Sequence, residues 1–97
     1  MNAITHFYNF NYNETSIFVY HANIGQGIPK HEHIYAHATM CNAGSCLVTV
    51  QSKDGEIKEY KINKFDRPLE LGFGRWHEIE ALEDGTVFVN VFAEGKY

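Results

Sequence analysis

Basic residues are scarce in this 97-residue sequence, and no long apolar run occurs. Eight Lys and Arg stand against twelve Asp and Glu, giving a net charge of −4 without any basic cluster. A nucleic-acid-binding surface needs concentrated positive charge to neutralise phosphates, so nucleic acid is not an expected partner. No apolar stretch approaches the roughly 20 residues that a helix needs to cross a bilayer, so no membrane partner is expected either. Residues 1–6 lack the charged-then-apolar order of a signal peptide, which predicts a cytoplasmic protein.

Cysteine is also scarce. Cys41 and Cys46 flank the turn formed by residues 42–45, so the two side chains could face each other across a hairpin. Without a secretory signal, the favoured interpretation is two reduced thiols that pack as small core residues. A disulfide is the alternative.

The composition is that of a folded protein. Apolar residues make up 44% of the chain, aromatic residues 14% and charged residues 21%, which differs from the composition of a disordered chain. Because 97 residues are too few for two hydrophobic cores, we expect a single domain over residues 1–97.

The apolar pattern predicts an all-β fold, since no segment shows sustained 3.6-residue periodicity. Short β-branched and aromatic segments alternate with turn signals instead. The predicted strands are residues 4–12, 15–24, 33–41, 46–52, 57–62, 69–71, 76–81 and 86–93. About eight short strands spaced by 8–12 residues are typical of a sandwich or barrel.

Turn signals separate these segments. Asn13-Glu14, residues 53–56 and residues 83–85 predict turns between neighbouring strands, and residues 25–29, with two glycines and a proline, predict a break. Residues 77–83 also contain helix-forming types, so a short helix is an alternative there.

The predicted last strand, residues 86–93, is apolar on both faces. A strand of this kind suits the centre of a sheet that a second sheet or a partner subunit covers.

The chain contains six histidines, three of them within seven positions. His31 and His33 would point to the same side of a strand, and neutral imidazole is a common ligand of transition metals. On a straight strand His37 would lie about 13 Å beyond His33, too far to share an ion, so the chain must bend between them. A strand that crosses from one sheet to the other would supply that bend. His77, which follows a glycine-rich turn, is the candidate for a fourth ligand.

The spacing Gly25-x5-His31-x-His33-x3-His37-x6-Gly44 resembles the first motif of the cupin family, G-x5-H-x-H-x3-4-E-x6-G. Every position matches in spacing, and one departs in type, because His37 stands where the family usually has glutamate.

A second resemblance lies further along the chain. Gly74-x2-His77 is similar to the core of the second cupin motif, P-x-G-x2-H, with Gly72 where proline is usual and Ala81 where asparagine is usual. The two motifs occur in the family's order, with predicted strands between them.

The resemblance to cupins implies a small jelly-roll barrel, also called a double-stranded β-helix, with one divalent metal ion inside. Carried over residue by residue, the metal ligands are His31, His33, His37 and His77. Such an all-histidine set is similar to that of a minority of cupins. His6 and His21 match no motif and are expected at the surface or in the core.

Four neutral ligands leave the charge of a divalent ion uncompensated by protein, so the ion would attract anionic ligands. Octahedral Fe, Mn, Co or Ni would keep two open positions, whereas tetrahedral Zn would keep none. The sequence does not choose among Fe, Mn, Ni, Co, Cu and Zn.

Tyr35 shares the parity of the histidines and Ile79 that of His77, so both are predicted to line a small substrate pocket, with core packing as the alternative. Arg75 and Glu78 have the opposite parity and are expected to face solvent.

Two functions stay open. The first is a metal-dependent enzyme acting on a small organic acid, diketone or phenol, foremost a dioxygenase and secondly an isomerase or lyase. The alternative is a non-catalytic cupin that binds a metal ion or a small metabolite. The resemblance further implies a homodimer formed by sheet packing, and it assigns no catalytic residue beyond the metal ligands.

Overall fold

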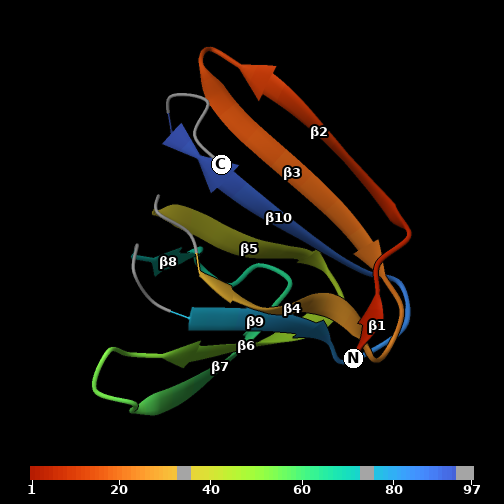
Figure 1. Cartoon of the computed structure of the whole chain (residues 1–97). Helices are drawn as coiled ribbons and strands as arrows, with labels where there is room; N and C mark the ends of the chain where they lie inside the picture. Colours follow the sequence, from red (N-terminus) through yellow and green to blue (C-terminus); the bar gives the residue numbers. More distant parts are fainter. Residues whose placement is uncertain (33–35, 73–75, 94–97) are drawn as a thin grey trace.

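A computed structural model describes residues 1–32, 36–72 and 76–93 of the chain, which form two five-stranded β-sheets (Figure 1). In order across the sheet, sheet 1 contains β1 (Asn2–Ala3), β4 (Gln26–Glu32), β9 (Trp76–Ala81), β6 (Ser45–Gln51) and β7 (Ile57–Asn63). Sheet 2 contains β2 (His6–Tyr12), β3 (Thr15–Ala22), β10 (Thr86–Phe92), β5 (His37–Ala43) and β8 (Leu69–Leu71). The predicted all-β jelly roll is therefore confirmed.

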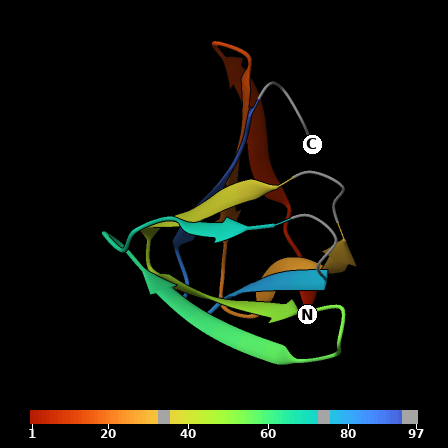
Figure 2. The same ribbon diagram turned by 90° about the vertical axis from the view of Figure 1, so that its left-hand side faces the viewer.

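The hydrophobic core lies between the two sheets. Its fully buried members include Val48 and Ile79 from sheet 1 and Phe88 from sheet 2, each 0% exposed. The β2–β3 hairpin extends beyond sheet 1, and its turn lies far from the β6–β7 hairpin in both views (Figures 1 and 2). The inner surface of this hairpin is consequently less covered than the rest, and Phe7 remains 59% exposed although it stacks on Tyr20.

Several turn predictions are confirmed. Asn13 and Glu14 join β2 to β3 with positive φ angles of 49° and 68°, and glycines supply the positive φ at Gly55 and Gly85. Residues 86–92 form β10, which lies between β3 and β5 as the predicted central strand. The helical alternative for residues 77–83 is wrong, because Trp76–Ala81 is a strand.

The prediction of a break at residues 25–29 is wrong, because this segment enters β4. Gly27 is required there by close packing, since an added Cβ would lie 1.9 Å from the carbonyl oxygen of Ile79. Pro29 falls in the irregular stretch between Ile28 and His31, where the register with β9 shifts, and a bulge tolerates the missing N–H. With β4 and the two-residue β1, the chain has ten described strands instead of about eight.

Both cysteines are buried and free, in agreement with the favoured interpretation. The thiol of Cys41 donates to the carbonyl oxygen of Ala43 at 3.1 Å. Burial raises the pKa of the Cys46 thiol to about 12, so Cys46 stays protonated and acts as a small apolar side chain.

Among the described residues, no helix has the length and apolar character needed to span a bilayer.

Candidate metal centre

Two buried histidines from different sheets meet inside the barrel. His37 is the first residue of β5 and is 5% exposed, and His77 is the second residue of β9 and is 2% exposed. Their Nε2 atoms lie 3.2 Å apart, although the residues are 40 positions apart in the sequence. The expected change of sheet explains this approach, because β4 belongs to sheet 1 and β5 to sheet 2.

His31 lies next to this pair. In the antiparallel ladder of β4 and β9 it is the direct partner of His77, so both side chains lie on the same face of sheet 1. The rings of His31 and His77 are 4.3 Å apart between centroids and meet edge to face. Three of the four histidines of the motif spacing are thus brought together.

Hydrogen bonds assign the ring protons. Nδ1 of His31 lies 2.7 Å from the carbonyl oxygen of Pro29, which only accepts, so this nitrogen carries the proton. The Thr39 hydroxyl donates to Oδ1 of Asn90 at 2.6 Å, so its oxygen accepts from Nδ1 of His37 at 3.2 Å. In both neutral rings Nε2 is therefore the nitrogen that carries the lone pair.

The same assignment makes His77 the donor in its contact with His37. Since Nε2 of His37 carries a lone pair, Nε2 of His77 must carry the proton between them. A divalent ion in place of that proton would need His77 in its other tautomer.

The separation of the two nitrogens suits a common ion. With metal–nitrogen bonds of about 2.1 Å, neighbouring ligands lie about 3.0 Å apart at a right angle and about 3.4 Å apart at the tetrahedral angle. The observed 3.2 Å falls between these values. Proton donation from the far ring nitrogen to a carbonyl or hydroxyl group is also the usual support of a ligating histidine.

The described histidines do not complete a metal site on their own. Within residues 1–32, 36–72 and 76–93, no three His, Cys, Asp or Glu side chains are placed so that they could hold an ion together. His33, the remaining predicted ligand, lies outside the described residues, as do Tyr35 and Arg75.

The other histidines and pocket candidates named from the sequence differ in burial and in the face on which they lie. Ile79 is fully buried in the hydrophobic core, on the same face of β9 as His77. Glu78 is half-buried on the opposite face, and His6 and His21 are exposed and opposite each other on β2 and β3.

Two site residues were missed by the sequence analysis. Thr39 and Asn90 are 0% and 2% exposed and connect the far side of His37 to the central strand. The sequence does contain a sign of Asn90, because it is the single asparagine in the apolar strand β10 and occupies an inward position. Phe92 follows at the next inward position, with its ring 4.6 Å from that of His37.

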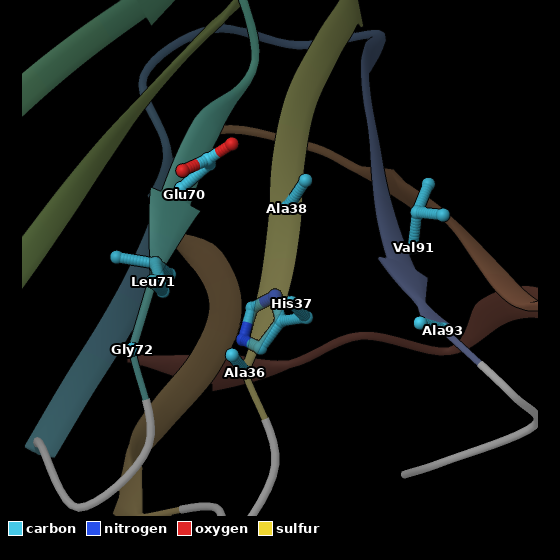
Figure 3. A pocket seen from close by; sticks show the side chains of 8 residues that line it. All are labelled: Ala36, His37, Ala38, Glu70, Leu71, Gly72, Val91 and Ala93. Atoms are coloured by element: carbon cyan, nitrogen blue, oxygen red, sulfur yellow. The ribbon is translucent and has the colours of Figure 1, made fainter.

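A hollow of about 430 Å³ lies at the ends of β5, β8 and β10 (Figure 3). Ala36, His37, Leu71 and Gly72 are among the residues that line it. The hollow thus reaches the strand end that carries His37.

No protein-family model matches the sequence, and no curated protein matches it significantly. Solved structures do match. A tryptophan-to-tyrosine variant of oxalate decarboxylase from Bacillus subtilis is 26% identical, with a TM-score of 0.76 over 84% of this chain and 21% of that chain.

Two further matches are of the same kind. A structure of the Bacillus subtilis enzyme, from work on its Mn(II) centres, is 25% identical to this chain. Its TM-score is 0.77 over 86% of this chain and 22% of that chain. The formate complex of oxalate decarboxylase from Lactobacillus farciminis is 26% identical, with a TM-score of 0.76 over 86% of this chain and 24% of that chain. The chain thus spans less than a quarter of the length of these structural neighbours.

Proposed function

The chain has the cupin fold, and we propose that it binds one divalent metal ion and acts on a small organic acid. The observation that carries the proposal is the 3.2 Å approach of Nε2 of His37 to Nε2 of His77. His31, His33, His37 and His77 are the proposed ligands. Fe, Mn, Ni, Co, Cu and Zn are all compatible with imidazole, and the Mn(II) centres named for one structural neighbour make Mn the first ion to test.

The protein groups around the site have separable tasks. The Pro29 carbonyl and the Thr39 hydroxyl accept from the far ring nitrogens of His31 and His37, which fixes both rings with Nε2 as the nitrogen that carries the lone pair. Asn90 orients the Thr39 hydroxyl, and Phe92 excludes water beside His37. When bound, the ion would supply a positive charge that no carboxylate in the shell reduces, and that charge favours a carboxylate ligand.

A small organic acid is the substrate class that this environment suits. A carboxylate would compensate the charge that four imidazoles leave, and a barrel of this size favours a small ligand. All three structural neighbours described above are named as oxalate decarboxylase, and one is a formate complex. Dioxygenase action remains a narrower proposal within the same site, as do action on a diketone or phenol and isomerase or lyase chemistry. The cytoplasmic location stays a prediction.

A non-catalytic metal- or metabolite-binding cupin is the second candidate. It is favoured by the side chains around His37, since Thr39, Asn90 and Phe92 offer no carboxylate for proton transfer.

Metal analysis combined with turnover assays separates the two candidates. Protein purified without chelator should contain about one divalent ion per chain. With Mn(II) or Fe(II) and a panel of small acids, an enzyme would consume acid, and the measured uptake of dioxygen and release of carbon dioxide would identify the reaction. A loaded protein that consumes no acid would support the binding function, and a protein that takes up no ion would contradict both.

Acid should release the ion. Protons compete for the same Nε2 lone pairs, so metal content should be full near neutral pH and fall as the pH drops below about 6. Metal content followed after dialysis at each pH measures this loss. Retention unchanged at pH 4 would show that histidines are not the ligands.

A further inference from the structure

Phe65 occupies a backbone conformation that phenylalanine rarely adopts. It is the third residue of the turn formed by residues 63–66, which follows β7 and is closed by a hydrogen bond of 3.1 Å from the Asp66 N–H to the Asn63 carbonyl oxygen. The φ angle of Phe65 is 75°, a value that a type II turn requires at this position and that glycine or asparagine usually supplies. A residue with a Cβ is strained in this region, so Phe65 costs the fold stability.

The side chain of Phe65 does not offset that cost. It is 91% exposed, the largest exposed fraction among the large hydrophobic residues that the structure describes. The backbone strain and the exposure of an aromatic ring to water both oppose folding. A residue that breaks a local rule without a structural return is typical of a functional site.

The turn carries positive charge in an acidic protein. Lys64 and Arg67 lie on either side of Phe65 in the sequence, and the Lys64 ammonium is 5.0 Å from the centre of the Phe65 ring. Within the described part of the chain, neither Lys64 nor Arg67 has a carboxylate at ion-pair distance. The Asp66 carboxylate serves the turn itself, because it accepts from a backbone N–H at 2.7 Å. Residues 60–68 contain three cations and one carboxylate, although the whole chain has a net charge of −4.

A hollow of about 480 Å³ lies beside the turn. Met40, Cys41 and Pro68 form its apolar part, and Lys64 and Phe65 also line it. The thioether of methionine is flexible and polarisable, which suits a surface that accepts different apolar side chains. The turn and the hollow, together called the Phe65 site, therefore combine an apolar recess, an aromatic wall and an adjacent cation.

The Phe65 site is separate from the metal centre. His37 begins β5, whereas Met40 and Cys41 lie toward its other end, so Met40 is about 10 Å from His37 at roughly 3.3 Å per residue. No proposed metal ligand lines the hollow beside the turn. Failure of the metal proposal would consequently leave the Phe65 site unaffected.

We propose that the Phe65 site binds an acidic peptide segment of another protein, which places an apolar side chain in the hollow and carboxylates beside Lys64 and Arg67. Charge complementarity selects this occupant, because cations without a carboxylate partner favour anionic groups. A short peptide contacts only the positive turn. An anionic membrane or a nucleic acid would also face the rest of a chain with a net charge of −4, and a flat bilayer would leave the hollow empty.

Titration with a synthetic peptide tests the proposal. The probe is Glu-Glu-Trp-Glu-Glu with blocked ends, added to the full ¹⁵N-labelled chain in the presence of chelator. Amide signals of residues 40–42 and 63–67 should shift and saturate with a dissociation constant on the order of 100 µM, since a short peptide covers far less area than a standard interface. No saturable shift at about 2 mM peptide, roughly twenty times that constant, would overturn the proposal.

Two control peptides separate the contributions of the hollow and of the cations. Glu-Glu-Ala-Glu-Glu lacks the large apolar side chain, and Lys-Lys-Trp-Lys-Lys lacks the carboxylates. Each should bind at least about tenfold more weakly than the probe. Equal affinity of all three peptides would show that the binding has no specificity for an apolar acidic segment, which contradicts the proposal.

The variant Phe65→Gly tests the strain and the contact together. Glycine adopts a positive φ without strain, so the midpoint of urea denaturation should stay at or above the wild-type value, while affinity for the probe should fall by at least about tenfold. Tyr12→Ala is the matched control, because it removes another aromatic side chain that is 73% exposed, and it should leave the affinity unchanged. A lower midpoint for Phe65→Gly would show that Phe65 serves the fold, and unchanged affinity would exclude it from a binding site. Either result overturns the proposal.

Two other occupants would give different results. Co-sedimentation with vesicles of anionic phospholipid that Phe65→Gly abolishes, without any effect of the probe peptide, would assign the turn to a membrane surface. A molar mass of twice 11.1 kDa that Phe65→Gly returns to that of one chain would assign the turn to a second copy. Both outcomes would replace the acidic peptide as the occupant.

Discussion

The two ends of the barrel interior differ in chemistry, although the same strands build both. β9 has the buried His77 as its second residue and ends with Ala81, and β5 begins with the buried His37 and continues past Cys41. At the apolar end, Phe88 stacks on Tyr20 with ring centroids 5.0 Å apart. At the Phe88 end the buried groups are apolar and their burial stabilises the fold, whereas the histidine end also contains buried polar groups, each of which destabilises the fold unless it is hydrogen-bonded.

The largest expected effect comes from the apolar end. Phe88→Ala removes a fully buried ring and should lower the free energy of unfolding by about 3–5 kcal/mol, measured by urea denaturation. Phe65→Ala is the control, because Phe65 is 91% exposed, and it should change stability by less than about 0.5 kcal/mol. Equal stabilities of the two variants would show that the apolar end is not the source of folding energy.

Substitutions at the histidine end should change the affinity for metal ions. His77→Ala removes a proposed ligand and should weaken binding of Mn(II) or Zn(II) by at least about 100-fold, or roughly 2.7 kcal/mol, while the chain remains folded. Calorimetric titration measures this change. His21→Ala, which alters an exposed histidine, should leave the affinity unchanged. A folded His77→Ala protein with wild-type affinity would exclude His77 as a ligand.

Alkaline pH should weaken the apolar end. The pKa of Cys46 is raised by burial from 9.0 to about 12, so above pH 9 the unfolded chain loses a proton that the folded chain keeps. The cysteine's contribution is therefore fully present below pH 9 and declines toward pH 12, by at most about 1.4 kcal/mol per pH unit.

Comparison with Cys46→Ala isolates this effect from the titration of other groups. Urea denaturation at pH 8 and pH 10 should show a smaller decrease for the variant than for the wild type. Equal decreases would mean that Cys46 is not buried as the structure places it.

The smallest expected effect concerns the support of His37. Thr39→Val keeps the shape but removes the hydroxyl that holds Nδ1, so metal affinity should fall by about tenfold. Thr49→Val, on the outer face of β6, should leave affinity unchanged. A serine at position 39 should restore part of the affinity, and no recovery would indicate a packing defect instead of a lost hydrogen bond.

Much of the fold was accessible from the sequence because alternation and turn residues are local signals. The turns at Asn13-Glu14 and Gly85 and the two-faced apolar strand β10 were identified in this way. β4 was not, because the reason for Gly27 is the carbonyl of Ile79, more than 50 residues away in the sequence. Local patterns cannot distinguish a glycine that ends a strand from one that admits a neighbouring backbone.

The candidate site was accessible for a different reason. The spacing of His33 and His37 predicted a bend, and the chain does change sheet between β4 and β5, which places His37 beside His77. Thr39 and Asn90 were missed because their role depends on pairing between β5 and β10, which the order of residues along the chain does not reveal.

The position of the histidine pair across the two sheets has a mechanical consequence. His37 belongs to sheet 2 and His77 to sheet 1, so any separation of the sheets at this end must pull the two rings apart. An ion held by both would oppose that opening, and amide hydrogens near the starts of β5 and β9 should exchange with solvent more slowly when the protein is loaded. Amides at the Phe88 end, which no ligand bridges, should exchange at the same rate in either state.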